Sequence, residues 1–374
     1  MPDPIYLDHN ATTPVHPDVL QAMLPFLTEH FGNPSSEHVY GHAAKAGVDK
    51  GRAQVAELIG ASPDEIVFTA NGTEANNLAI RGIPRQGSTR RHVVTTTIEH
   101  PATTQATNVI ERHGWEVSRA SVDETGRATE VPSLIRSDTA LVTVMHANNE
   151  VGTLQPIAQI AEAAHAAGAY MHTDAAQSLG KVPVKVDELG VDLLSLAGHK
   201  LYAPKGIGAL YVRRGTPLRP VLVGGGHERG MRPGTENVAF IAGLGAACEL
   251  AQRDLESESA RVQSLRDRLW QQLQAGVPGL RLNGHLTLRL PNTLNVGFPG
   301  RMGMDVLASA PQIAASTGSA CHESGVDPSG VLVAMGQDAT TALGAVRLTL
   351  GRSTTVEDVD RAASALIAAA RVAA

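Results

Sequence analysis

The feature that most constrains the fold is an alternation of short β-rich runs with stretches of helical pattern between about residues 64 and 213. The β-rich runs lie at 66–69, 92–95, 141–144, 170–173 and 193–195. Between two of them, the stretch 156–167 carries apolar residues at helical spacing. Because parallel strands need long crossover connections, this alternation predicts an α/β fold with a mostly parallel sheet covered by helices.

The pattern changes after Asn237. Two helical runs are expected at 238–251 and 259–275, short strands at 286–290, 293–296 and 346–350, and a final helix at 356–370. A chain of 374 residues is also too long for one simple core. We therefore expect a large α/β domain at 16–250 and a smaller α+β domain formed by 1–15 and 251–374.

Charge and composition exclude several classes of protein. The net charge of −6 is modest, and Lys and Arg are scattered, so direct nucleic-acid binding is not expected. The first residues lack the basic and apolar regions of a leader peptide, and no apolar run is long enough for a membrane span. We expect a cytoplasmic protein without membrane contact. No Cys or His pattern has metal-ligand spacing, so no resident metal is expected.

Polar residues follow several of the predicted strands, where ligands bind in open α/β sheets. Asp174 follows the run 170–173, and Lys200 follows the run 193–195. A lysine amine that forms a Schiff base and a carboxylate that keeps a pyridine nitrogen protonated are the pair that pyridoxal 5'-phosphate requires. Taken singly, each residue is more often a solvated surface charge.

Two further positions have both a functional and a structural interpretation. Gly72 and Thr73 open a helix after the run 66–69, where free N–H groups bind phosphate, but this is also the pattern of an ordinary helix N-terminus. His100 follows the run 92–95 and is suited to stacking on a cofactor ring or moving protons, whereas a structural histidine is the default for such a residue.

The two cysteines occupy contrasting sequence contexts. Cys248 lies on a predicted helix among apolar residues, where a buried and inert thiol is expected. Cys321 lies in 316–325, a run of small polar residues bounded by glycine, followed by His322. A thiol on an exposed loop is suited to act as a nucleophile, with a passive loop cysteine as the alternative.

Taken together, six ordered motifs resemble the group I, NifS-like cysteine desulfurases of the class V aminotransferase family, which have the aspartate aminotransferase fold (fold type I). The motifs lie at 6–14, 31–36, 146–150, 198–200, 224–234 and 347–352, so the resemblance covers essentially the whole chain.

The resemblance implies roles for particular residues of this chain. Lys200 would bind pyridoxal 5'-phosphate, Asp174 would pair with the ring nitrogen, and Gln177 would contact the phenolic oxygen. His100 would stack on the ring as a catalytic residue. The remaining implied positions are Gly72, Thr73, Gly198 and His199 at the cofactor, Thr235 at the phosphate bound by the other subunit of a homodimer, and Asn149 and Arg347 at the substrate carboxylate.

The implied reaction converts L-cysteine to L-alanine. Lys200 would shift the α-proton, Cys321 would attack the substrate sulfur, and the resulting persulfide would pass to an acceptor protein. The acceptor could serve iron–sulfur assembly, with Cys321 as a transient iron–sulfur contact, or a dedicated pathway such as DNA phosphorothioation or tRNA thiolation. Alternatives are a selenocysteine lyase or an aminotransferase on the same fold, and a non-catalytic nucleotide-binding module built on Gly-rich loops.

Three departures from the family pattern favour a dedicated pathway. Ala197 stands where many relatives have a serine that binds the phosphate, and His322-Glu323 replaces a Thr-Ser pair that often follows the nucleophile. The sequence also ends at Ala374, without the C-terminal extension by which housekeeping relatives dock an iron–sulfur scaffold.

Overall fold

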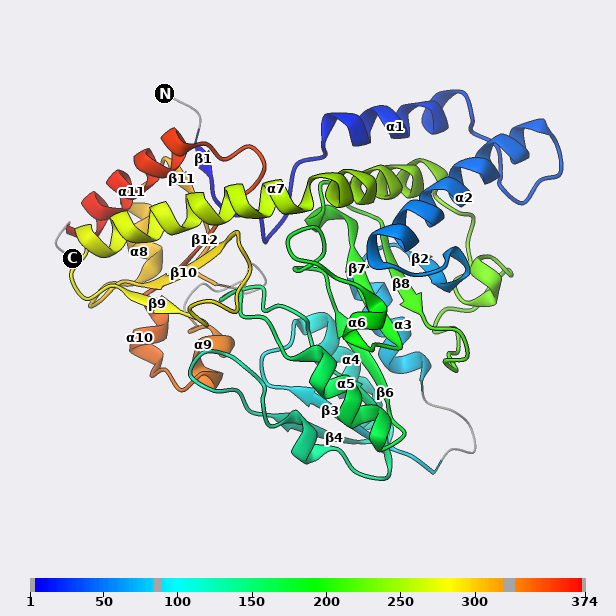
Figure 1. The fold of residues 1–374 in the computed structure, drawn as a ribbon, viewed down its shortest axis with the longest axis horizontal. Helices are drawn as coiled ribbons and strands as arrows, with labels where there is room; N and C mark the ends of the chain where they lie inside the picture. The colour runs from blue at the N-terminus through cyan, green and yellow to red at the C-terminus, as the bar shows by residue number, and fades with distance from the viewer. Residues whose placement is uncertain (1–3, 84–88, 319–326, 372–374) are drawn as a thin grey trace.

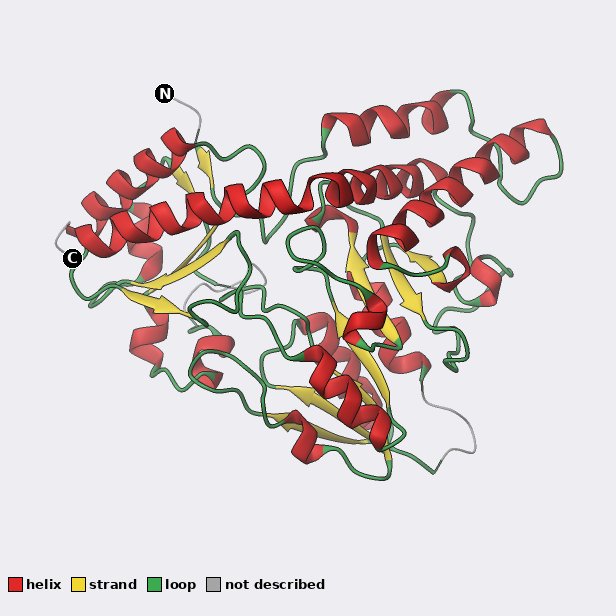
Figure 2. Cartoon of the chain, viewed as in Figure 1, coloured by secondary structure: helices red, strands yellow, loops and turns green. Residues whose placement is uncertain are grey.

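The computed structural model describes residues 4–83, 89–318 and 327–371. Its strands fall into two separate groups, each flanked by helices (Figure 2). The long helix α7 (Val238–Gly276) runs along both groups (Figure 1).

The larger group is a seven-stranded sheet with the order β2-β8-β7-β6-β5-β3-β4. Only β8 runs antiparallel to its neighbours, so β2 and β7 point the same way as the parallel strands. The predicted mostly parallel α/β sheet is therefore confirmed. The strands are β2 (Ile66–Thr69), β3 (His92–Thr96), β4 (Glu116–Ala120), β5 (Thr139–Thr143), β6 (Tyr170–Asp174), β7 (Leu193–Ala197) and β8 (Gly208–Val212).

Both faces of this sheet are buried, because successive residues of a strand point to opposite sides. Leu141 packs in one hydrophobic cluster and Val142 in another, and the same division separates Leu193 from Leu194. One face meets α3 (Gly72–Gly82) and α4 (Pro101–Arg112). The other meets α2 (Val39–Ile59), α5 (Ile157–Ala166) and the first half of α7, with α1 (Pro17–Thr28) packed on the outside and the short α6 (Val186–Leu189) nearby.

The smaller group contains an antiparallel sheet in the order β12-β10-β9, formed by β9 (Arg281–Asn283), β10 (Thr293–Gly297) and β12 (Ala345–Thr349). A parallel pair joins β1 (Ile5–Tyr6) to β11 (Ile313–Ala314). Its helices are α8 (Gly303–Ala308), α9 (Gly330–Ala334), α10 (Ala339–Leu343) and α11 (Val356–Arg371).

Two large hydrophobic clusters follow the same division, whereas a smaller cluster joins Ile98, Met145 and Val151 to residues 331–345. One cluster takes its residues from Val19 to Ala251, and another takes them from Ile5 and Leu7 and from Val262 to Ala369. We propose on this basis that the chain forms two domains with the bounds expected above, 16–250 and 1–15 plus 251–374.

Two predictions of secondary structure were wrong. The helical runs 238–251 and 259–275 are one helix, α7, because the polar residues between them favour helix and contain no glycine or proline. Their polarity reflects surface contacts, such as the ion pair of 2.7 Å between Asp254 and Arg352. The predicted strand 286–290 is a loop in which Leu286 is 75% exposed and only Arg289 forms an isolated bridge.

Candidate active site

A cavity of about 240 Å³ lies where the carboxyl ends of β2, β6 and β7 meet residues of the smaller group. Nine of the predicted site residues line it: Gly72, Thr73, His100, Asn149, Asp174, Gln177, His199, Lys200 and Arg347. These residues come from segments far apart in the sequence. The parallel strand directions bring those of the large sheet to one edge, and Arg347 comes from β12 of the smaller group.

Lys200 reaches the cavity at the end of a single 3-10 turn, Gly198–Lys200, that directly follows β7. Its Nζ donates hydrogen bonds to the carbonyl oxygens of Asn10, at 2.6 Å, and Ala11, at 2.7 Å. Gly198 itself does not line the cavity. A Cβ on Gly198 would lie 2.8 Å from Cγ2 of Ile207, so close packing of the turn requires glycine there.

Asp174 ends β6 and is held by two hydrogen bonds. Nδ2 of Asn76 donates to Oδ2 of Asp174 at 2.6 Å, and the backbone N–H of Ala176 donates to Oδ1 at 2.9 Å. Only 8% of Asp174 is exposed. Asn76 was not among the predicted site residues, although its position on α3, three residues after Thr73, placed it on the same side of that helix.

The N-terminus of α3 forms one wall of the cavity. Oδ1 of Asn71 caps the helix by accepting from the backbone N–H of Glu74 at 2.8 Å. The N–H groups of Gly72 and Thr73 belong to the first turn, where a helix has no internal acceptors for them. A Cβ on Gly72 would lie 3.1 Å from the Cβ of Ala197, so the missing side chain leaves room at this wall.

Two histidines border the cavity with depressed pKa values. Burial lowers the pKa of His100, and Lys200 lowers it further against the opposing effect of Asp174. Nδ1 of His100 accepts from the backbone N–H of Ala102 at 3.1 Å and caps α4, which fixes the ring. Burial also lowers the pKa of His199 to about 4, with Lys200 adding to the effect. Both rings are therefore neutral at pH 7.

Arg347 of β12 enters the cavity from the smaller group and is only 2% exposed. Its Nη2 pairs with Oδ1 of Asp8 at 2.8 Å, and its Nη1 donates to the carbonyl oxygen of Asn149 at 3.1 Å. Its Nε is buried and has no hydrogen-bond partner among the residues that the structure describes. The site therefore holds a cationic group with one donor that no described residue uses.

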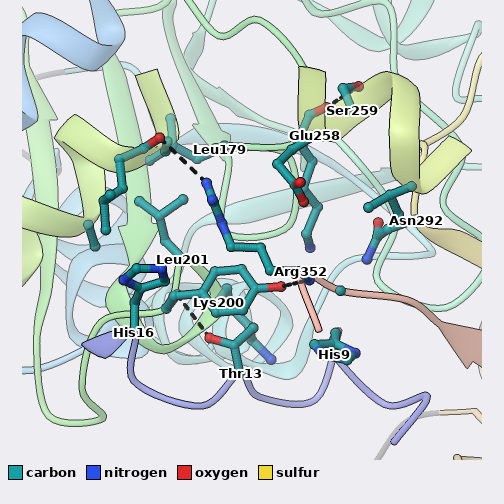
Figure 3. Close-up of a pocket in the computed structure, with 18 of the residues that line it drawn as sticks. His9, Thr13, His16, Leu179, Lys200, Leu201, Glu258, Ser259, Asn292 and Arg352 are labelled. Carbon is teal, nitrogen blue, oxygen red and sulfur yellow. Dashed lines mark hydrogen bonds between the residues drawn. The ribbon is translucent and has the colours of Figure 1, made fainter. Parts of the chain in front are cut away.

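A second, smaller cavity of about 50 Å³ lies on another side of the Lys200 side chain, which borders both cavities. His9, Asn292, Glu258 and Arg352 surround it (Figure 3). Burial lowers the pKa of His9 to about 4, and its Nε2 has no hydrogen-bond partner in the described part of the chain. This cavity was not predicted from the sequence.

The remaining candidates lie apart from the cavity or outside the described residues. Thr235 is exposed and is not among the lining residues. Cys321 lies outside the described residues. Cys248 is buried in the core as predicted, and burial raises the pKa of its thiol.

The described residues contain neither a cluster of metal ligands nor a membrane span. Within residues 4–83, 89–318 and 327–371, no three His, Cys, Asp or Glu side chains are grouped as metal ligands. Over the same residues, no helix combines the length and the apolarity that crossing a bilayer would take.

The sequence and the fold both match known proteins. The profile of the family "Aminotransferase class-V" matches residues 5–362, so this chain belongs to that family. A cysteine desulfurase of Nostoc sp. is 47% identical over 361 residues, which cover 96% of this chain and 90% of the relative. Family and enzyme class are therefore as predicted from the sequence.

Solved structures give the same result. A NifS-like protein has a TM-score of 0.91 and 36% identity, covering 98% of both chains. A structure described as SspA in complex with cysteine has a TM-score of 0.82 and 36% identity, covering 92% of this chain and 98% of the other. The predicted fold class is confirmed.

Proposed function

We propose that this enzyme is a cysteine desulfurase that uses pyridoxal 5'-phosphate to convert L-cysteine to L-alanine, with the sulfur retained as a persulfide on Cys321. The observation that carries the proposal is the convergence of Lys200 and Asp174, from the ends of two strands, on one cavity. The relatives that bear the name cysteine desulfurase along nearly the whole chain support it.

The residues of the cavity fit this cofactor. The Lys200 amine would bond to the aldehyde carbon, Asp174 would face the ring nitrogen and His100 would stack on the ring. The N–H groups of Gly72 and Thr73, with His199 nearby, would receive the phosphate at the positive end of α3. Gly198 would act by shaping the Lys200 turn. The bound cofactor supplies an electron sink that makes the α-proton of the amino acid acidic.

Arg347 and Asn149 are suited to hold the carboxylate of the substrate. The Nε of Arg347, which has no partner among the described residues, and the low exposure of its guanidinium group favour a charge-assisted bond with an incoming anion. The ion pair with Asp8 fixes the plane of the guanidinium group, so the substrate meets a donor that is already oriented. The solved relative in complex with cysteine supports the choice of substrate.

Lys200 is proposed to move the α-proton. Once its Nζ is released from the cofactor, it is a primary amine next to the carbonyl oxygens of Asn10 and Ala11. These carbonyls accept hydrogen bonds and keep the amine at the wall of the cavity, where it takes the proton from the α-carbon and later delivers one to the β-carbon.

Cys321 is proposed as the nucleophile. The described part of the chain before Cys321 ends at Gly318. Two residues earlier, the backbone of Ser316 exchanges N–H to carbonyl hydrogen bonds with the backbone of Arg347. The chain resumes at Asp327, and the hydroxyl of Ser329 donates to the carboxylate of Glu150, the neighbour of Asn149. The thiolate attacks the sulfur of the substrate, the S–S bond forms as the C–S bond breaks, and the electron pair of the C–S bond leaves with the carbon that becomes the methyl group of alanine.

A homodimer is part of the proposal. Exposed apolar side chains gather on α1, α2 and the segment between them, and again at Leu222 and Val223, which precede Thr235 in the same glycine-rich segment. Apolar surface of this kind favours association with another subunit. The apolar side chains of the first group are Leu20, Leu24, Leu27, Phe31, Val39 and Tyr40.

The cytoplasmic location and transfer of sulfur to an acceptor protein, without direct contact with nucleic acid or membrane, also remain part of this proposal. Iron–sulfur assembly and a dedicated thiolation pathway differ only in that acceptor, which a mixed disulfide trapped on Cys321 would identify.

The test combines a spectrum with product analysis. Purified protein should show the visible absorbance of a lysine-linked cofactor and should form alanine from L-cysteine, with an alkylatable persulfide on Cys321. Lys200→Ala should remove the lysine-linked band and the activity, whereas Lys185→Ala should retain both, because Lys185 contacts only carbonyl oxygens of Glu57 and Leu58. Alanine formation in Cys321→Ser at the wild-type rate would favour a lyase, whereas formation of the 2-oxo acid of cysteine in place of alanine would favour an aminotransferase.

A further inference from the structure

Lys181 is a partly buried lysine behind the cavity that the reaction described above does not use. Its Nζ donates to Oε1 of Gln177 at 3.0 Å and to Oδ1 of Asn10 at 3.2 Å. Part of its side chain borders the smaller cavity next to Lys200. Among the residues that the structure describes, no carboxylate forms an ion pair with it.

The bond to Lys181 determines which end of the Gln177 amide faces the cavity. In its ammonium form Lys181 can only donate, so the atom of Gln177 that contacts it is then the amide oxygen. The amide nitrogen therefore points the other way, where Nε2 of Gln177 donates to the carbonyl oxygen of Asn10 at 3.0 Å. Nζ of Lys200 donates to the same carbonyl oxygen at 2.6 Å. The N–H group of Gln177 is thus presented beside the lysine amine.

This orientation matters because of the chemistry of the proposed cofactor. Its phenolic oxygen is attached to the ring carbon next to the one that bears the aldehyde, so it lies beside the lysine linkage. An amide N–H at that place stabilises a phenolate by donating to it, whereas a flipped amide would present a carbonyl oxygen and repel it.

We propose that Lys181 is a positioning residue that fixes the carboxamide of Gln177 with its N–H group toward the cofactor's phenolic oxygen. The inference rests on the proposed use of pyridoxal 5'-phosphate and adds a residue to that site.

The surroundings of Lys181 support a positioning role. Burial, together with the positive charges of Lys200 and Arg347, lowers the pKa of Lys181 to about 7. His9 faces the same cavity with its pKa also lowered by burial, and Glu258 borders that cavity on α7. A partly buried cation without an ion pair loses some of its hydration, and the hydrogen bonds to Gln177 and Asn10 are its main compensation among the described contacts.

Asn10 extends the same network into the smaller group of elements. Its Nδ2 donates to Oγ1 of Thr293 at 2.9 Å, and its Oδ1 accepts from Nδ2 of Asn292 at 3.0 Å. Through Asn10, Lys181 is therefore linked to Thr293, the first residue of β10, and to Asn292, the residue before it. The rigidity of this network keeps the amide of Gln177 from rotating.

The test measures the pH at which the visible band of the lysine-linked cofactor titrates. In Lys181→Met, the amide loses its fixed orientation and the phenolate loses its donor, so the deprotonated form of the lysine linkage is destabilised. We expect the midpoint to rise by about one pH unit. Lys181→Arg, which keeps a donor, and Lys185→Met, which removes a lysine from outside the site, should titrate like the wild type.

Gln177→Ala separates orientation from simple charge. If Lys181 acts through the amide, adding Lys181→Met to Gln177→Ala should move the midpoint by less than about 0.3 pH unit, the additivity error of independent changes. An equal shift in both backgrounds, or no shift in Lys181→Met, overturns the inference. Lys181→Gln serves as the second variant if Lys181→Met does not fold. A wild-type protein with no such band instead overturns the proposed function, on which the inference rests.

Discussion

Asn76 on α3 and Asp174 at the end of β6 are joined by a hydrogen bond of 2.6 Å, although 98 positions separate them in the sequence. The bond links the helix whose first turn lines the cavity to a carboxylate that lines the same cavity. Both ends of the proposed cofactor site are therefore held by the same helix.

Asn76→Ala should weaken cofactor binding. It removes one of the two donors that fix the Asp174 carboxylate and leaves a buried oxygen without its partner, which typically costs about 1.4 kcal/mol, or a tenfold rise in Kd. Titration of the apoenzyme with pyridoxal 5'-phosphate measures this. Asn77→Ala is the control, because Asn77 bonds to Thr73 and Arg81 on the same helix instead. Equal affinity in both variants would contradict the role of Asn76.

Cys321→Ser should lose alanine formation from L-cysteine by at least about a thousandfold while it keeps the visible band, because hydroxyl oxygen does not form a persulfide. Cys248→Ala should keep the activity, since Cys248 lies on α7, is buried in the hydrophobic core and has a raised pKa. Alanine formation and persulfide labelling are measured for both variants. Loss of activity in Cys248→Ala alone would show that the two cysteines have been assigned the wrong way round.

Arg347→Lys should raise KM for L-cysteine by about tenfold or more, because an ammonium group cannot reproduce the fork that contacts Asp8, Asn149 and the substrate at once. The visible band should remain. Steady-state kinetics give KM and kcat, with Arg289→Lys as a control for a buried arginine outside the main cavity. An unchanged KM would place the carboxylate site elsewhere.

The free energy of unfolding should fall as the pH drops from about 6.5 toward 4. Burial lowers the pKa values of His146 and His172 to about 4, while both are near 6.5 in the unfolded chain. The unfolded state therefore binds protons first, and the stabilisation present above pH 6.5 is lost on acidification by up to about 1.4 kcal/mol per pH unit and group. Urea unfolding at pH 7, 6 and 5 measures it.

His172→Asn tests one of these groups separately. The ring of His172 bonds to Oγ1 of Thr143 at 2.7 Å and Oγ of Ser195 at 3.0 Å, so the variant is less stable at every pH. Its loss of stability between pH 6.5 and 5 should nevertheless be smaller than that of the wild type. A parallel pH dependence in the two proteins would exclude His172 as a contributor.

The sequence predicted those parts of the site that depend on local order. Asp174 and Lys200 directly follow strands, and parallel strands end at the same edge of a sheet, so the order of residues alone was enough to predict their convergence. Gly72 and Thr73 were recognisable for the same reason, as the opening of a helix after β2.

Contacts between distant segments could not be predicted in this way. Asn10, Asn76 and Lys181 carry no strand-end or helix-end signal, and their roles depend on how α3 and the N-terminal segment pack against β6 and β7. The strand β8 was missed because it begins at Gly208 and, running antiparallel to its neighbours, does not fit the alternation of parallel strands with helices. The charged residues between two apolar stretches likewise led to the prediction of two helices where the structure has the single helix α7.

That continuity has a mechanical consequence. A helix of 39 residues is about 58 Å long, and its first half packs with the large sheet while its second half packs with the small one. A hinge at the middle of α7 would break several backbone hydrogen bonds, so the helix is a rigid connection between the large and the small sheet. Lys200 follows a strand of the sheet that packs with the first half of the helix, and Arg347 lies on a strand of the sheet that packs with the second half, so the helix fixes their spacing before any amino acid arrives.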